Sequence, residues 1–129
     1  MIVDSSALIA IVIGEPEAET FAQLIIANRP ARISGGTWIE LAAVITRGHP
    51  HRYPLLLDLI QQAGLVIEPV SAEQAQIGHN AYRRFGIGSG HPARLNFGDC
   101  FAYALAKSLN EPLLFKGDDF AQTDVTTTH

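Results

Sequence analysis

The chain has 129 residues, of which 47% are apolar and 17% charged, and its formal net charge is −4. This length and composition fit one compact domain over residues 1–129 and exclude a largely disordered chain. The negative net charge argues against a broad basic surface for binding nucleic acid. It does not exclude a small site that handles phosphate groups through a bound metal ion.

Cysteine content and hydropathy narrow the cellular setting. Cys100 is the only cysteine, which excludes an intrachain disulfide framework and a cysteine-rich zinc site. No apolar run reaches the roughly 18 residues that a membrane span needs, and no basic segment precedes the first apolar run. We therefore expect a cytoplasmic protein that makes no membrane contact.

Short apolar runs alternate with longer segments of helical periodicity along the whole chain. The runs predict strands at 2–4, 32–34, 65–69 and 112–115. The periodic segments predict helices at 16–28, 38–47, 54–63, 71–85 and 97–109, with a short helix after Asp4 and a glycine-rich loop at 86–96. This alternation predicts an α/β fold with a mainly parallel sheet and helices on both faces.

Three acidic residues are isolated within apolar segments. Asp4 is the only charged residue among the first 14, Glu40 lies alone between Arg32 and Arg47, and Asp99 lies alone between Arg94 and Lys107. Burying an unpaired carboxylate costs several kcal/mol or raises its pKa. Because Asp4 ends one predicted strand and Asp118-Asp119 follows another, these acids are expected to meet at the carboxyl ends of the strands and to share a cation.

Each acid also has a purely structural interpretation. Thr37 to Glu40 is a capping-box pattern, and Asn96 stands three residues before Asp99, so both acids could serve helix N-termini. The pair Asp118-Asp119 follows a glycine and is typical of a turn. Only the joint pattern of the acids favours a functional site.

Four segments together carry a family resemblance. They are Met-Ile-Val-Asp-Ser-Ser-Ala-Leu at the start, Trp-Ile-Glu-Leu-Ala around Glu40, Leu-Asn-Phe-Gly-Asp-Cys-Phe-Ala-Tyr-Ala-Leu-Ala around Asp99, and Leu-Leu-Phe-Lys-Gly-Asp-Asp-Phe near the end. With these segments the chain resembles, over essentially its whole length, the VapC toxins, which are PIN-domain ribonucleases of type II toxin–antitoxin systems. The resemblance implies a three-layer α/β/α sandwich and Mg²⁺- or Mn²⁺-dependent cleavage of RNA.

The resemblance also implies a set of site residues. Asp4, Glu40, Asp99 and Asp118 match the acidic quartet that binds the metal and catalyses cleavage. Asp118 is preferred over its neighbour because it lies nearer the strand, although the adjacent Asp119 keeps that choice open. Supporting roles are expected for Ser6, Asn96 and Asp119.

Oxygen donors suit Mg²⁺ or Mn²⁺ rather than zinc, and either one or two ions would fit this set. Positive side chains are expected to hold the RNA backbone, or else to be ordinary surface residues; they are Arg83, Arg84, Arg94 and Lys116.

Two kinds of protein partner are expected. The resemblance implies a small VapB antitoxin, and the forked guanidinium of an arginine in its tail would pair with the clustered carboxylates. The apolar surplus around Tyr53, Leu55 to Leu57 and Ile60 predicts a homodimer or an antitoxin groove.

Two other functions remain open from the residues alone. A catalytically degenerate α/β domain would bind a basic peptide through the acidic pocket, and divalent-metal affinity with turnover separates it from the nuclease. A receiver or phosphohydrolase domain is the other. The strand ending at Glu68-Pro69 lacks the acceptor aspartate of a receiver, and Asp4-Ser5-Ser6 lacks the second aspartate of a haloacid-type phosphatase.

Overall fold

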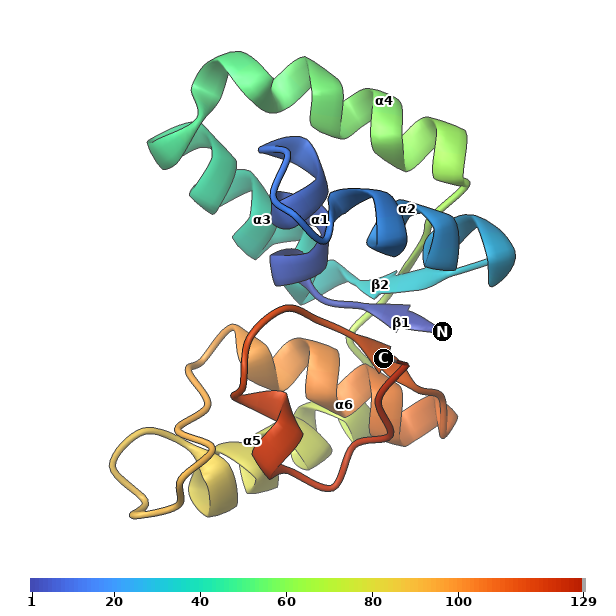
Figure 1. Ribbon diagram of the computed structural model, residues 1–129. Coiled ribbons are helices and arrows are strands. Elements are labelled where there is room, and N and C mark those ends of the chain that lie inside the picture. Colours follow the sequence, from blue (N-terminus) through green and yellow to red (C-terminus); the bar gives the residue numbers. More distant parts are fainter. Residues whose placement is uncertain (129) are drawn as a thin grey trace.

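A computed structural model describes residues 1–128 and contains a four-stranded sheet in the order β3-β2-β1-β4 (Figure 1). The strands are β1 (Ile2–Val3), β2 (Arg32–Ser34), β3 (Val66–Glu68) and β4 (Leu113–Leu114). All of their pairings are parallel, and Ile2 of β1 pairs with Arg32 on one side and with Leu113 on the other. The predicted α/β fold is confirmed, and the sheet is wholly parallel among these strands.

Helices cover both faces of the sheet, as Figure 1 shows. One face carries α1 (Ser5–Val12), α2 (Ala18–Ala27), α3 (Gly35–Gly48) and α4 (Tyr53–Ala63), and the other carries α5 (Ala72–Phe85) and α6 (Asp99–Leu109). Two short 3₁₀ helices are η1 (Pro50–Arg52) and η2 (Phe120–Gln122). The expected three-layer α/β/α sandwich is therefore confirmed.

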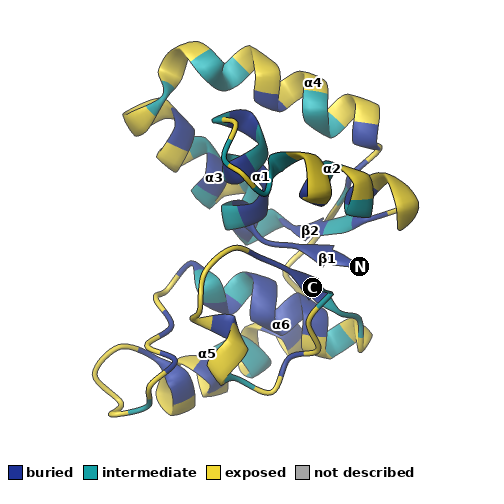
Figure 2. Ribbon diagram, in the orientation of Figure 1, coloured by how far each residue is buried: buried dark blue, intermediate teal, exposed yellow. Residues whose placement is uncertain are grey.

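Side-chain alternation along the strands divides the interior into two cores. Val3 and Leu114 join the cluster under α1 to α4, whereas Ile2 and Leu113 join the cluster over α5 and α6. Neighbouring residues of a strand point to opposite faces, so a sheet this short still anchors both layers. Figure 2 shows β1 buried between the two layers of helices, whereas the edge strand β3 is only partly buried.

Three helix starts differ from the sequence expectation. The helix expected from residue 16 starts at Ala18, after a turn that contains Pro16, and the helix expected from residue 97 starts at Asp99. The helix expected from residue 38 starts at Gly35, because Ser34 caps it by accepting a hydrogen bond from the Gly36 amide at 3.2 Å. The sequence does not predict this start, because the first turn contains two glycines and glycine is a poor helix former.

The strand order sets the place where a site can form. From β1 the chain runs to β2 and then β3 on one side of β1, and it enters β4 on the other side. The crevice of a parallel α/β sheet lies beyond the carboxyl ends of the strands at such a reversal. A functional site is therefore expected at the carboxyl ends of β1 and β4. Within residues 1–128, no helix has the length and apolar character of a membrane span.

Packing of α3 against α6 depends on Gly36. A Cβ atom at Gly36 would lie closer than 3.0 Å to the ring of Phe101 on α6. We expect Gly36→Ala to lower the free energy of unfolding by about 1–3 kcal/mol, because the overpacked ring must move. Urea unfolding measures this change. Gly48→Ala on the same helix is the matched control, since no atom lies within 4 Å of its Cβ position, and it should be neutral or stabilising; equal effects at both glycines would contradict the expectation.

Candidate active site

Acidic side chains gather beyond the carboxyl ends of β1 and β4. Asp4 directly follows β1, and Asp119 follows β4 after a turn at Gly117, whose φ is +105°. Both border a cavity of about 270 Å³. The cavity is lined by residues of α1, α3, the start of α6 and the segment after β4, namely Asp4, Ser5, Ser6, Ile9, Glu40, Val44, Asn96, Asp99, Lys116, Asp119 and Phe120.

Asp4 is the most buried of these acids, with 2% of its surface exposed. It caps α1: its Oδ2 accepts hydrogen bonds from the Ser6 amide at 3.0 Å and from the Ser6 hydroxyl at 2.6 Å. The same hydroxyl oxygen accepts a hydrogen bond from the backbone amide of Lys116 at 3.0 Å. Ser6 thus connects the end of β1 to the end of β4.

The other carboxylate oxygen of Asp4 has no partner. Oδ1 is buried and accepts no hydrogen bond from any described residue. A buried carboxylate oxygen without a partner is costly, so this atom indicates a missing positive group. It is the clearest sign in the cavity that a cation belongs there.

Glu40 does not serve the N-terminus of α3. It lies in the second turn of that helix, whose start is capped by Ser34 instead. Its Oε1 accepts a hydrogen bond from the Ser5 hydroxyl at 2.9 Å, across 35 residues of sequence. The capping-box interpretation of Thr37 and Glu40 is therefore wrong, and the carboxylate is directed to the cavity.

Asp99 combines both interpretations. Its backbone amide donates to Asn96 Oδ1 at 2.9 Å, and its Oδ2 accepts from the Asn96 amide at 3.0 Å. This reciprocal pair closes the turn that leads into α6, whose own cap residue, Gly98, forms no side-chain capping bond. Both side chains also line the cavity. A structural role in this turn and a site role are thus compatible for Asp99.

The structure brings Asp119, rather than Asp118, into the cluster. Asp119 lines the cavity and its charge raises the pKa of both Asp4 and Asp99, whereas Asp118 is not among the lining residues. The resemblance favours Asp118, because the family acid closes the strand, and leaves Asp119 as the open alternative. Gly117 has a φ of +105°, so the chain turns between β4 and the two acids, and Asp119 is the one that lines the cavity.

Three acids of the cavity, Asp4, Glu40 and Asp99, have raised pKa values. Burial raises the pKa of Asp4 against the opposing hydrogen bonds of Ser6, and burial likewise raises the pKa of Glu40 despite the Ser5 hydroxyl. Burial, followed by the charges of Asp4, Asp119 and Glu40, raises the pKa of Asp99 to about 7. Without a cation, the cluster therefore holds protons at pH values where isolated carboxylates have lost them.

The side chains that line the cavity offer mainly oxygen donors. Within residues 1–128, no three His, Cys, Asp or Glu side chains form a ready-made metal site. The chemistry still fits a hard divalent cation, because the candidate ligands Asp4, Glu40, Asp99 and Asp119 all offer carboxylate oxygens. The unpartnered Oδ1 of Asp4 provides one ligand atom whose hydrogen-bonding capacity is unused.

Four basic side chains were expected to bind RNA, and among them only Lys116 lines the acidic cavity. Its ammonium group forms ion pairs with Glu15 and, at 3.0 Å, with Glu17. Arg84 lies 4.0 Å from Asp124 and over the ring of its neighbour Phe85.

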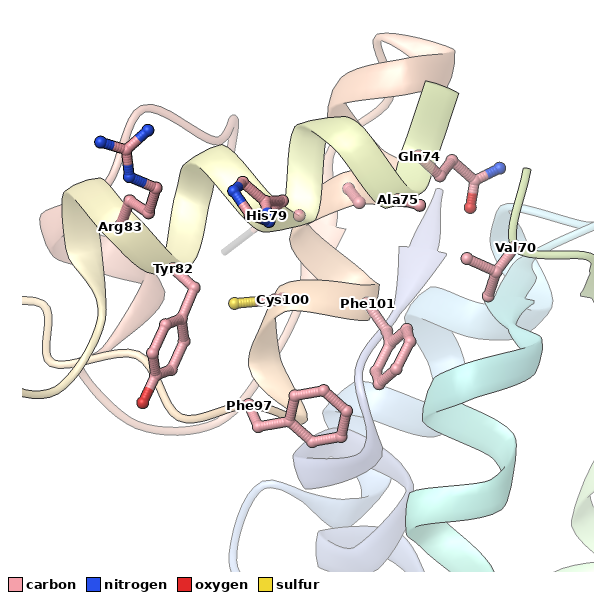
Figure 3. A pocket seen from close by; sticks show the side chains of 11 residues that line it. Val70, Gln74, Ala75, His79, Tyr82, Arg83, Phe97, Cys100 and Phe101 are labelled. Carbon is pink, nitrogen blue, oxygen red and sulfur yellow. The ribbon is translucent and has the colours of Figure 1, made fainter. Parts of the chain in front are cut away.

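Arg83 lines a second, apolar cavity between α5 and α6 (Figure 3), and Arg94 has a left-handed φ of +50° in the 86–96 loop. The structure does not bring these two arginines or Arg84 to the acids.

The second cavity, of about 400 Å³, was not anticipated from the sequence. Figure 3 shows Tyr82, Phe97 and Phe101 around it, with the Cys100 thiol near its centre. Burial and the neighbouring charge of Asp99 raise the pKa of Cys100 to about 11. The thiol is therefore protonated at neutral pH, and a protonated thiol is a poor nucleophile.

Known proteins were compared with the chain. A model of the PIN domain family matches residues 1–125. Ribonuclease VapC42 of Mycobacterium tuberculosis is 45% identical over 126 residues, which cover 97% of this chain and 96% of that protein. The "Ribonuclease VapC" of Mycolicibacterium smegmatis is 44% identical, and the match covers all of both chains.

Solved structures agree in fold. The crystal structure of M. tuberculosis VapC20, a toxin that cleaves the sarcin–ricin loop, matches with a TM-score of 0.74 at 18% identity and covers 97% of this chain and 95% of its own. At this identity the match speaks for the fold alone. The family model and the close relatives decide the identity: the chain belongs to the PIN-domain family and, within it, to the VapC ribonucleases.

Proposed function

We propose that this VapC ribonuclease hydrolyses RNA phosphodiesters with one or two Mg²⁺ or Mn²⁺ ions held by the acids of the 270 Å³ cavity. The observation that carries the proposal is the buried, unpartnered Oδ1 of Asp4 among three further carboxylates. Asp4 and Asp99 are the expected main ligands, with Glu40 and Asp119 beside them. Asp119 takes the place assigned to Asp118 from the sequence.

The chain's own residues divide the work of hydrolysis. A divalent cation supplies a Lewis acid for the phosphate and lowers the pKa of water. Glu40 has Oε1 held by Ser5, and its raised pKa suits it to accept the proton that the attacking water loses. The P–O bond to the leaving nucleoside then breaks, and that oxygen takes a proton from solvent. Lys116 is the one expected cation near enough to the acids to contact the RNA backbone there.

Two protein partners are proposed, an antitoxin that binds the acids and a second copy of the chain. An arginine in the tail of a VapB-type antitoxin would supply the positive charge that the acids lack, by bidentate pairing with carboxylates. A homodimer is proposed from the apolar side chains left on the surface: Leu55 and Leu57 are 52% and 45% exposed, although Leu56 between them is fully buried. The cytoplasmic location also stays a proposal, supported by the single, unpaired Cys100.

Removing one main carboxylate tests the nuclease directly. Asp4→Asn and Asp99→Asn should each lower metal-dependent cleavage by about 10²-fold or more, because a ligand charge is lost while asparagine still accepts the local hydrogen bonds. Gel assays on structured and single-stranded RNAs in EDTA, Mg²⁺ or Mn²⁺ measure this. A fully active variant would end the assignment. Metal binding without cleavage of any RNA would instead favour a degenerate domain that binds a basic peptide.

The fourth acid can be identified by a matched pair of variants. Asp119→Asn should lower the single-turnover rate constant of cleavage by about tenfold or more, since a carboxylate that lines the cavity is lost. Asp118→Asn should stay within about twofold of wild type, since that residue does not line the cavity. Single-turnover cleavage under saturating Mn²⁺ measures both. The reverse order of effects would restore Asp118 as the family acid.

The raised pKa of Asp99 predicts how the stability of the metal-free protein depends on pH. Because the pKa of Asp99 is about 7 in the folded state, against an ordinary value of 3.8 for aspartate, the folded state binds more protons than the unfolded state between those two pH values. Stability is therefore lost as pH rises from about 4 to 7. We expect Asp99→Asn to unfold at a Tm about 4 °C above wild type at pH 8, allowing for solvent screening, with no difference near pH 4.

Thermal unfolding in EDTA across this pH range measures the Tm difference between the two proteins. Asp118→Asn serves as the control, since it removes an acid that does not line the cavity. If wild type and Asp99→Asn differ equally at every pH, burial does not raise the pKa of this carboxyl.

A further inference from the structure

Glu40 is held by two residues from other segments of the chain. The Ser5 hydroxyl, at the start of α1, donates to Oε1 at 2.9 Å. On its other side the carboxylate lies against Gly98, just before α6: the three atoms nearest to a Cβ built at Gly98 all belong to Glu40, and two of them are closer than 3.0 Å. The carboxylate thus occupies the space in which any other residue would carry its side chain.

Backbone conformation does not require glycine at position 98. The dihedral angles of Gly98 are φ −64° and ψ −35°, the ordinary helical region that every L residue adopts. By contrast, Gly117 has a φ of +105°, where a side chain is strained. What the structure requires at residue 98 is therefore the absence of a Cβ, and the group that needs the room is the carboxylate of Glu40.

We propose that Gly98 and Ser5 are positioning residues for Glu40, which fix its carboxylate in the acidic cavity from two sides. Ser5 holds one oxygen, and Gly98 leaves the space that the other oxygen fills. A glutamate side chain has three rotatable bonds, so a single hydrogen bond leaves it considerable freedom. The two contacts join α1 and α3 to α6, which lies on the opposite face of the sheet.

A consequence for catalysis follows, and it rests on the proposed ribonuclease activity. A carboxylate that is displaced by about 1 Å loses roughly 10²-fold in rate when it must meet a reacting group. Gly98→Ala would displace the Glu40 carboxylate because the clashing atoms are the far end of a flexible side chain. The backbone is compatible with alanine, so the fold is retained while the carboxylate moves.

Thermal unfolding of the metal-free protein tests the positioning without any activity. Ser5→Ala should lower the Tm by about 3 °C, because the hydrogen bond to Glu40 is lost. In the Gly98→Ala background the same substitution should change the Tm by less than about 1 °C, because the carboxylate has already moved away. Additive effects of the two substitutions would overturn the proposal.

If Gly98→Ala does not fold, the same substitution can be tested in the Glu40→Ala variant. Glu40→Ala removes the clashing atoms, so Gly98→Ala combined with Glu40→Ala should fold as well as Glu40→Ala alone, since Gly98 has helical dihedral angles. Failure of this double variant to fold would show that residue 98 is restricted by something other than Glu40. The proposal would then be wrong.

Cleavage kinetics test the catalytic consequence. Gly98→Ala should lower kcat by about 10²-fold with KM changed less than about threefold, and it should cause no further loss in a Glu40→Ala background. Gly48→Ala, in open space on α3, should keep the wild-type kcat. Wild-type kcat in Gly98→Ala would refute the positioning role. Absence of cleavage in the wild type would refute the proposed function instead, while the Tm comparison would still decide the positioning.

Discussion

The burial of Asp4 at the end of β1 is the interaction on which the site depends. Its Oδ2 caps α1 through Ser6, and the Ser6 hydroxyl also accepts the Lys116 amide beyond β4. One small hydrogen-bonded unit therefore fixes the carboxyl ends of two adjacent parallel strands and the start of the first helix. Because these groups satisfy Oδ2 alone, the buried Oδ1 accepts no hydrogen bond from residues 1–128. The geometry that builds the fold therefore also leaves this carboxylate in need of a positive group.

The two apolar cores stabilise the fold against the cost of the clustered carboxylates. The strands are only two or three residues long, yet their side chains alternate between a core under α1 to α4 and a core over α5 and α6. The carboxylates repel one another where the two layers meet, and burial adds to the cost of their charges. Packing on both sides of the sheet must outweigh that repulsion, since hydrogen bonds from serine hydroxyls and backbone amides offset only part of it.

Local patterns in the sequence were enough to predict much of this structure. Periodicity predicted the strands and helices, and the isolation of Asp4, Glu40 and Asp99 in apolar segments predicted that they would meet. Local patterns placed the start of α3 too late, because its first turn contains two glycines. They could not decide between Asp118 and Asp119, because the turn at Gly117 sets which of the two lines the cavity. The roles of Ser5 and Gly98 were missed for another reason, because each is defined by contact with Glu40 across more than 30 residues, which no local pattern encodes.

A single electrostatic deficit links the proposed metal, substrate and antitoxin. The acids raise one another's pKa values, so protons, divalent cations and an arginine guanidinium all compete for the same oxygens. Nearby, Lys116 contributes little to neutralising the acids, because Glu15 and Glu17 already pair with its ammonium group. A divalent ion differs from the other two competitors because it neutralises the acids and still has coordination sites for phosphate and water. The proposed antitoxin arginine would inhibit by neutralising the carboxylates while leaving no coordination site at which phosphate can bind.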